Sequence, residues 1–243
     1  MKSVKFRMIA IALLSATMPF TAKAQDKVEA SVGADFVSNY IWRGTDCGGV
    51  SIQPSMGVSY KGLSLAAWGS VGIDKEDARE IDLTLGYNTG GFNVSVTDYW
   101  FSYHKEDGGY TGDYFKYGAH STIHIFEATL GYDFGPLALS WNTYFAGDDY
   151  TKENGDRAYS TYVGISAPFK LGGLDWSAEV GLTPWEGAYA NKFNVTNLTL
   201  KAEKEIKFTN SFSLPTFAQV TFNPHTQGAY LSLIHISEPT RRS

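Results

Sequence analysis

The feature that most constrains this 243-residue chain is the alternation of apolar with polar or small residues in many short segments. Between Glu80 and Asn88, for example, Ile81, Leu83 and Leu85 occupy every second position. Successive side chains of a β-strand point to opposite faces, so a period of two indicates strands with one apolar face. No segment has a long helical period. The sequence therefore predicts an all-β protein.

Turn residues divide the alternating runs into twelve expected strands, of which the last begins at about Ala229. The connections alternate in length. The short ones are 61–62, 89–91, 135–136, 168–173 and 207–210. Those on the other side are 44–50, 73–79, 104–121, 146–157, 184–192 and, as a short exception, 223–228. An even number of strands of about ten residues, with short turns opposite long loops, is typical of a transmembrane antiparallel β-barrel.

A secreted β-sandwich is the alternative, because its strands also bury one apolar face. Three observations favour the barrel. Tyr and Trp gather toward the strand ends on the apolar face, as in the aromatic girdles of outer-membrane barrels. The opposite face is poor in lysine and rich in Ser, Thr, Gly and acids, as a wet lumen would be. The regular difference in loop length is unusual for a sandwich.

The two ends of the chain, residues 1–24 and 231–243, are set apart from the alternating segments between them. Residues 1–24 have a basic start, a short apolar run and the cleavage pattern Ala22-Lys23-Ala24, so we expect a secretory signal peptide. The apolar run is far shorter than the ~20 residues of a spanning helix. Residues 231–243 resemble the translated read-through of a sequencing-library adapter. We therefore expect a barrel of residues 25–230, a last strand truncated near Tyr230, and a non-native tail.

The expected barrel is acidic, with 14 basic and 24 acidic residues and a net charge of −10 over residues 25–230. Nucleic-acid binding requires a basic face, so this charge argues against nucleic acid as a partner. The single cysteine, Cys47, cannot form an internal disulfide. It lies in a Gly-rich loop, and no plausible nucleophile constellation surrounds it.

Several short motifs occur in a characteristic order and spacing. They are Ser38-x-Tyr40-x-x-Arg43-Gly44, Gln53-Pro54, Trp68-Gly69-Ser70, Glu80-Ile81-Asp82, Gly86-Tyr87, Asp98-Tyr99-Trp100, Ser140-Trp141-Asn142-Thr143 and Thr183-Pro184-Trp185-Glu186. On these motifs the chain resembles the TorF family of porin-like proteins, the Gcw_chp outer-membrane group, over most of residues 34–230. The resemblance implies an outer-membrane β-barrel with a pore role. It brings no established substrate and no catalytic residues.

The candidate pore-lining residues follow from the parity of the alternation. The face opposite the apolar one carries more acids than bases, which would favour the entry of cations. Alternatively, these carboxylates bond across a filled lumen or lie at its rims. The candidates are Glu80, Asp82, Glu127, Asp133, Asp175, Glu179, Glu203 and Lys201, with Arg43 at the pore mouth. For Arg43, a structural role at the outer rim, paired with a carboxylate, is the favoured interpretation.

The candidate girdle residues are large aromatics near the ends of the expected strands. The stretch 38–44 is expected at the outer rim of the first strand, with a loop beyond it. A bulge near Asp98 is expected to keep the following aromatics on the apolar face. The candidates are Tyr40, Trp42, Tyr60, Tyr87, Tyr99, Phe101, Tyr132 and Phe134.

An enzymatic reading finds little support. His120 and Ser121 are adjacent, and adjacent strand residues point to opposite faces, so they cannot easily bond within one strand. His120 and His124 without a third ligand make a poor metal site. The acidic loop 147–156 does not have EF-hand spacing. We expect no enzyme activity, no metal and no cofactor.

The sequence therefore predicts an outer-membrane porin-like channel of a Gram-negative bacterium, exported through a cleaved signal peptide. It would pass small polar solutes or ions by passive diffusion, with a preference for cations. The competing class is a non-conducting structural or adhesive barrel that binds partners through its outer loops. Membrane lipid is the expected surrounding in both cases. Solute identity and oligomeric state do not follow from the sequence.

Overall fold

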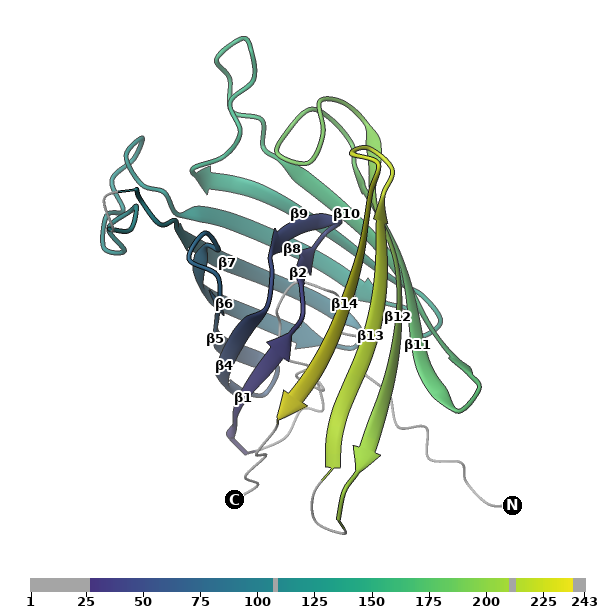
Figure 1. Ribbon diagram of the computed structural model, residues 1–243. Coiled ribbons are helices and arrows are strands. Elements are labelled where there is room, and N and C mark those ends of the chain that lie inside the picture. The colour runs from purple at the N-terminus through teal and green to yellow at the C-terminus, as the bar shows by residue number, and fades with distance from the viewer. Residues whose placement is uncertain (1–26, 107–108, 210–212, 238–243) are drawn as a thin grey trace.

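The structure is a computed structural model that describes residues 27–106, 109–209 and 213–237. It contains a closed barrel of twelve antiparallel strands and a separate two-stranded hairpin (Figure 1). The barrel strands are β1 (Glu29–Val37), β4 (Ser51–Tyr60), β5 (Leu63–Gly72), β6 (Arg79–Thr89), β7 (Phe92–Ser102), β8 (Ile125–Asp133), β9 (Ala138–Gly147), β10 (Thr161–Leu171), β11 (Leu174–Thr183), β12 (Asn194–Lys207), β13 (Ser213–Asn223) and β14 (Gly228–Ser237). The hairpin consists of β2 (Tyr40–Trp42) and β3 (Thr45–Gly48).

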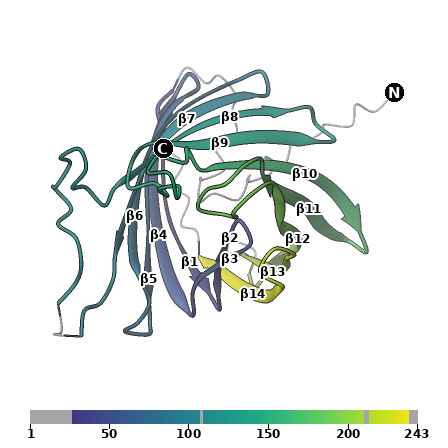
Figure 2. The ribbon, with the colours of Figure 1, turned by 90° about the horizontal axis from the view of Figure 1, so that it is seen from above.

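Each barrel strand pairs with the preceding and the following barrel strand of the chain, and β1 closes the ring against β14. The hairpin β2–β3 leaves this order, so that β1 pairs directly with β4. Seen from above, β2 and β3 lie inside the ring of strands (Figure 2). The predicted all-β barrel of twelve antiparallel strands is confirmed, and the closed ring excludes the sandwich.

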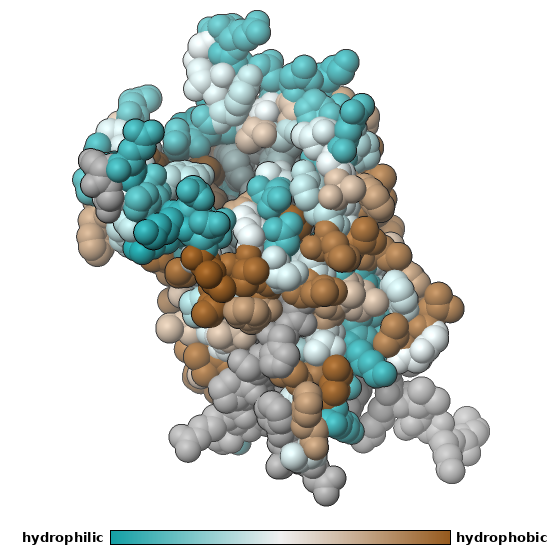
Figure 3. All heavy atoms as spheres, in the orientation of Figure 1, coloured by the Kyte–Doolittle hydropathy of each residue, from teal (hydrophilic) through white to brown (hydrophobic). Residues whose placement is uncertain are grey.

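The two faces of the wall have opposite chemistry. The alternating apolar side chains point outward, where Leu83 and Leu85 are 40% and 54% exposed. Polar side chains fill the inward positions, and hydroxyl pairs such as Thr199 and Thr221 bond across neighbouring strands at 2.8 Å. Apolar residues cover much of the wall, and hydrophilic loops stand above it (Figure 3).

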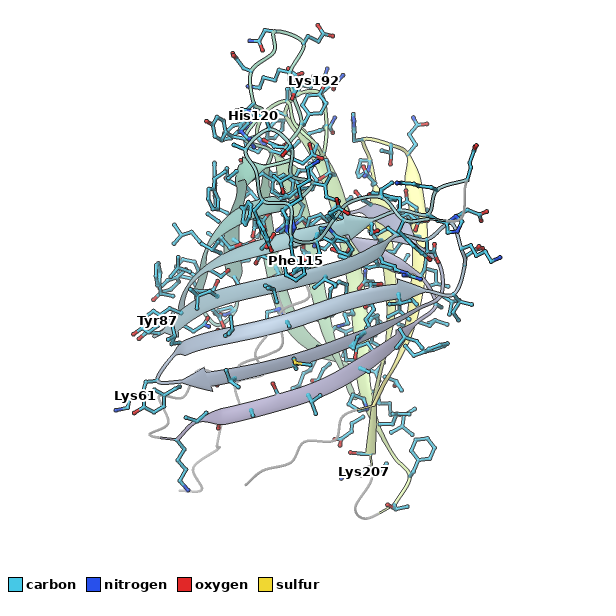
Figure 4. The ribbon with its side chains drawn as sticks, turned by 90° about the vertical axis from the view of Figure 1, so that its left-hand side faces the viewer. Lys61, Tyr87, Phe115, His120, Lys192 and Lys207 are labelled. Carbon is cyan, nitrogen blue, oxygen red and sulfur yellow. The ribbon has the colours of Figure 1, made fainter. Side chains whose placement is uncertain are left out.

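The connections divide into a short-turn end and a loop end, as predicted. Lys61 and Gly62 join β4 to β5 with positive φ at both positions, and a Cβ at Gly62 would lie 2.4 Å from the Asn88 carbonyl oxygen. Figure 4 shows Lys61 and Lys207 at the short-turn end, whereas His120 and Lys192 lie at the loop end. Within the described part of the chain, no helix has the length and apolarity needed to cross a membrane.

The expected bulge near Asp98 is wrong. The pairing of β6 with β7 continues without a shift from Arg79↔Ser102 to Thr89↔Phe92. Register shifts occur instead beside Glu127 in the β8–β9 pair and beside Leu182 in the β11–β12 pair. Since β7 keeps its alternation, the residues after Asp98 stay on the faces that their parity gives them.

The seam between β1 and β14 is the shortest contact in the ring. It has four residue pairs, from Ala34↔Ser237 to Val37↔Ile234. The last strand therefore runs beyond the expected cut near Tyr230, because residues 231–237 continue its ladder. Leu231 and Leu233 are exposed and Ser232 is buried, which fits the alternation of the wall. The foreign origin of this segment stays a prediction, and the expected signal peptide lies outside the described residues.

A chain that ends at Tyr230 should fail to close the barrel. It loses all four β1–β14 pairs and leaves backbone donors and acceptors of β1 without partners on that side. We expect the heat-modifiable gel migration of a closed barrel to disappear. A chain that ends at Ser237 keeps every described pair of the seam and is the control. Equal heat modifiability of the two chains would contradict the need for this seam.

Candidate lumen site

The lumen hairpin, residues 40–48, folds into the barrel instead of extending its rim. The turn between its strands is Arg43-Gly44, with φ values of 50° and 80°. Two consecutive positive φ angles give the tight hairpin turn that matches the twist of the flanking strands. A Cβ at Gly44 would lie 1.9 Å from the carbonyl oxygen of Thr196 on β12, and Asn223 on β13 donates to the Gly44 carbonyl at 3.0 Å. The hairpin tip is therefore docked against β12 and β13.

Arg43 reaches from this tip to the opposite side of the ring. Its guanidinium bonds both carboxylate oxygens of Glu127 on β8, at 2.5 Å and 2.9 Å. Both side chains are almost completely buried, at 2% and 1% exposure. A buried pair is stable only if its geometry is good and its remaining donors and acceptors are satisfied. Tyr189 accepts a bond from Arg43 at 2.6 Å, and Tyr99 donates to Glu127 at 2.9 Å, which meets part of this requirement.

Aromatic rings surround the Arg43 guanidinium. It lies 4.4 Å from the ring centroid of Trp42 and 4.8 Å from that of Tyr162, within the range of cation–π attraction. Tyr189 comes from the β11–β12 loop and donates to the Tyr144 hydroxyl at 3.1 Å. The hairpin and this loop thus meet the wall in one continuous cluster at the level of Arg43. This cluster is called the plug below, and its members are Trp42, Arg43, Tyr99, Glu127, Tyr144, Tyr162 and Tyr189.

A second polar network joins this plug to the β10–β12 wall. Glu179 accepts a bond from the Tyr162 hydroxyl at 2.5 Å and one from the Asn197 amide at 3.0 Å. It is 7% exposed. Hydrogen bonds to a charged acceptor are stronger than neutral ones, so these donors offset part of the cost of burying the carboxylate.

A third group lies on the other side of the hairpin, along β5 and β6. Glu80 and Asp82 point inward and are 5% and 6% exposed. The Tyr40 hydroxyl of β2 bonds to Glu80, and the Tyr40 ring packs on Trp68 of β5 with centroids 5.6 Å apart. The three groups together bring Arg43, Glu80, Asp82, Glu127 and Glu179 of the predicted set into the lumen.

The other predicted pore-lining residues lie toward the short-turn end and do not join these groups. Asp133 is exposed and accepts a bond from the Gly135 amide at 2.7 Å. Asp175 pairs with the exposed Lys170. Lys201 pairs with Glu203 at 2.6 Å. These are local contacts of the kind expected at a rim.

The predicted aromatic girdle divides into two groups. Four members are exposed on the outer face near the short-turn end: Tyr60, Tyr87, Tyr132 and Phe134. The assignment is wrong for the other four, because their rings face the lumen: Tyr40, Trp42, Tyr99 and Phe101. The hairpin carries the first two inward, and the uninterrupted alternation of β7 directs the last two inward.

Two residues of the plug missed by the sequence analysis had a usable signal. Tyr144 and Tyr162 occupy the polar parity of β9 and β10, between outward residues such as Phe145 and Val163. A bulky aromatic at an inward position indicates a filled lumen. Tyr189 had no such signal, because it lies in a loop.

His124 and Ser121 make separate local contacts and do not bond to each other in the structure. His124 bonds Asp98 at 2.7 Å and the Tyr114 carbonyl oxygen at 2.7 Å. Ser121 bonds to the Gly118 carbonyl within its own loop. Among the residues that the structure describes, no group of three or more His, Cys, Asp or Glu side chains could hold a metal ion.

The fold and the lumen define a closed antiparallel β-barrel with an apolar exterior, a polar interior and an inserted hairpin. No protein-family model and no curated protein matches the chain.

Removing Arg43 alone should be strongly destabilising. Arg43→Met leaves Glu127 buried without its cation, and we expect a loss of about 3–5 kcal/mol in the free energy of unfolding. The double variant Arg43→Met/Glu127→Met should recover much of this loss, because it removes the uncompensated charge. Urea unfolding of the protein refolded in lipid vesicles, followed by tryptophan fluorescence, measures both.

Lys170→Met is the matched control for this experiment. Its pair with Asp175 is exposed, with side chains 72% and 44% accessible, so the loss should stay within about 1 kcal/mol. A loss for Arg43→Met no larger than that of the control would show that the buried pair does not hold the plug.

Proposed function

We propose that this protein is an outer-membrane channel for the passive diffusion of small solutes or ions, with a preference for cations. The observation that carries the proposal is the inverted wall of the barrel. Apolar residues such as Leu65 and Leu85 face outward, whereas buried Glu80, Asp82 and Glu179 face inward. A lipid bilayer favours the outward apolar side chains, whereas water or ions in the lumen can solvate the inward carboxylates.

The membrane location is supported by the closed hydrogen-bonded ring. Lipid offers no partners to backbone groups, so a sheet spans a bilayer only when it closes. Tyr60, Tyr87 and Tyr132 are exposed on the outer face near the short-turn end, where an interfacial girdle belongs. Together with the expected signal peptide and the TorF resemblance, this favours the outer membrane of a Gram-negative bacterium.

The preference for cations is supported by the charge of the lumen. Four carboxylates are buried inside the barrel: Glu80, Asp82, Glu127 and Glu179. Among the described residues of the plug, Arg43 is the basic side chain that is buried with them. A pore lined by excess negative charge concentrates cations and repels anions.

The second candidate, a non-conducting barrel, is favoured by the lumen hairpin itself. Its contacts extend from Asn223 on β13 to Glu127 on β8, on opposite sides of the ring. A twelve-stranded barrel lies between the small barrels that side chains fill and the large ones that stay open. The hairpin would then be either a gate of the channel or a permanent filling.

Replacing residues 40–48 by a Gly-Ser linker of equal length should open the lumen. We expect the variant to show a larger single-channel conductance than the wild type in planar bilayers and a cation-selective reversal potential. The same replacement of residues 151–156, in an outer loop, is the control and should leave the conductance unchanged. Heat-modifiable migration verifies that both variants fold. Absence of current and of liposome swelling in the folded hairpin variant would favour the non-conducting barrel.

The depth of the outer face in the bilayer can be tested separately. Leu85→Arg, near the middle of β6, should cost about 2–4 kcal/mol of unfolding free energy in vesicles. Tyr87→Arg, two residues nearer the short-turn end, should cost only about 0–1 kcal/mol. Equal losses at the two positions would contradict a wall that spans the membrane.

A further inference from the structure

The carboxylates of the lumen differ in how they are satisfied. Glu127 has Arg43, and Glu179 has the Tyr162 hydroxyl and the Asn197 amide. Glu80 and Asp82 have no basic partner in the described part of the chain. This difference sets the β6 pair apart from the plug.

The backbone of β6 brings the two carboxylates together. Glu80 and Asp82 are two residues apart on one strand, so their side chains share the inward face. The charged groups that act most strongly on Asp82 are the carboxylates of Glu80, Asp98 and Glu127. The local field at the pair is therefore negative.

An unpartnered oxygen gives an independent sign of a ligand. Oδ1 of Asp82 is buried and has no hydrogen-bond partner in the described residues, while the residue is 6% exposed. A buried charge without a partner is costly, and a bound cation removes this cost. The oxygen lies on the same wall as Trp68, which pairs with Asp82 across β5 and β6, and Ser70, which pairs with Glu80.

The available ligands indicate which cation fits. The groups at the pair are carboxylate oxygens, with the Tyr40 hydroxyl bonded to Glu80. Oxygen ligands suit hard cations such as Ca²⁺ and Mg²⁺, and two carboxylates balance a divalent charge. Water would complete the coordination shell, as it commonly does for sites with few protein ligands.

We propose that Glu80 and Asp82 form a binding site for a hard divalent cation of the Ca²⁺ class, between the β5–β6 wall and the lumen hairpin. The role of this site as a station for permeating cations rests on the proposed channel function, whereas binding of the ion does not. Because Tyr40 contacts both Glu80 and Trp68, the bound ion lies against the base of the hairpin.

Terbium luminescence tests the binding directly, because Tb³⁺ replaces Ca²⁺ and is excited by nearby indole rings. Full-length protein refolded in vesicles should show Trp68-sensitised emission that Ca²⁺ displaces. The double variant Glu80→Gln/Asp82→Asn should bind Tb³⁺ and Ca²⁺ about tenfold more weakly or worse. Trp68→Phe should lose emission but keep the Ca²⁺ affinity measured by calorimetry.

Asp133→Asn/Asp175→Asn is the matched control, since it removes two carboxylates near the short-turn end and should keep both signals. Heat-modifiable migration shows that each variant is folded. Equal Ca²⁺ affinity for the wild type and the Glu80→Gln/Asp82→Asn variant would overturn the site. Reversal potentials separate the two proposals. Ca²⁺ binding lost in this variant, with no current in any variant, would support the site and refute the channel.

Discussion

The constraint on which the rest of the structure depends is the pairing of strand edges around the wall. The outer face is apolar, so in the proposed bilayer a strand edge left open would expose donors and acceptors to lipid, which cannot bond them. Each of the twelve strands has a neighbour on both sides, and the short ladder between β1 and β14 completes the ring over residues 34–37 of β1 only. Closure fixes the lumen as an enclosed space, and the alternation of each strand then decides which side chains enter it.

Two connecting segments place side chains in the enclosed space. The hairpin after β1 enters from one side, and the β11–β12 loop contributes Tyr189. The pair of Arg43 with Glu127 is the point where the hairpin, β7, β8 and this loop meet. Charge is therefore distributed unevenly across the lumen. Arg43 is paired with Glu127 on one side of the hairpin, and Glu80 and Asp82 of β6 lie on the other side.

Alternation made the barrel predictable, since it acts locally and repeats in every strand. The same rule gives Glu80, Glu127 and Glu179 inward positions, and these side chains are buried in the structure. It did not predict the hairpin, because the tip is positioned by a carboxylate 84 residues further along the chain. The prediction for Tyr99 was wrong because it assumed a bulge, whereas the alternation of β7 continues without a shift.

The position of the hairpin in the chain has a consequence for assembly. It follows β1 directly, and β1 is also the strand that meets β14 at the seam. We therefore expect the placement of the hairpin in the lumen and the closure of the wall to be coupled during assembly. Hydrogen bonds tie this entrance to β14: the Ser38 amide donates to the Leu233 carbonyl, the Leu233 amide donates to the Ser38 hydroxyl, and the Ser232 hydroxyl donates to the Asn39 carbonyl. The seal of the wall and the path of the chain into the lumen are thus linked at a single place in the structure.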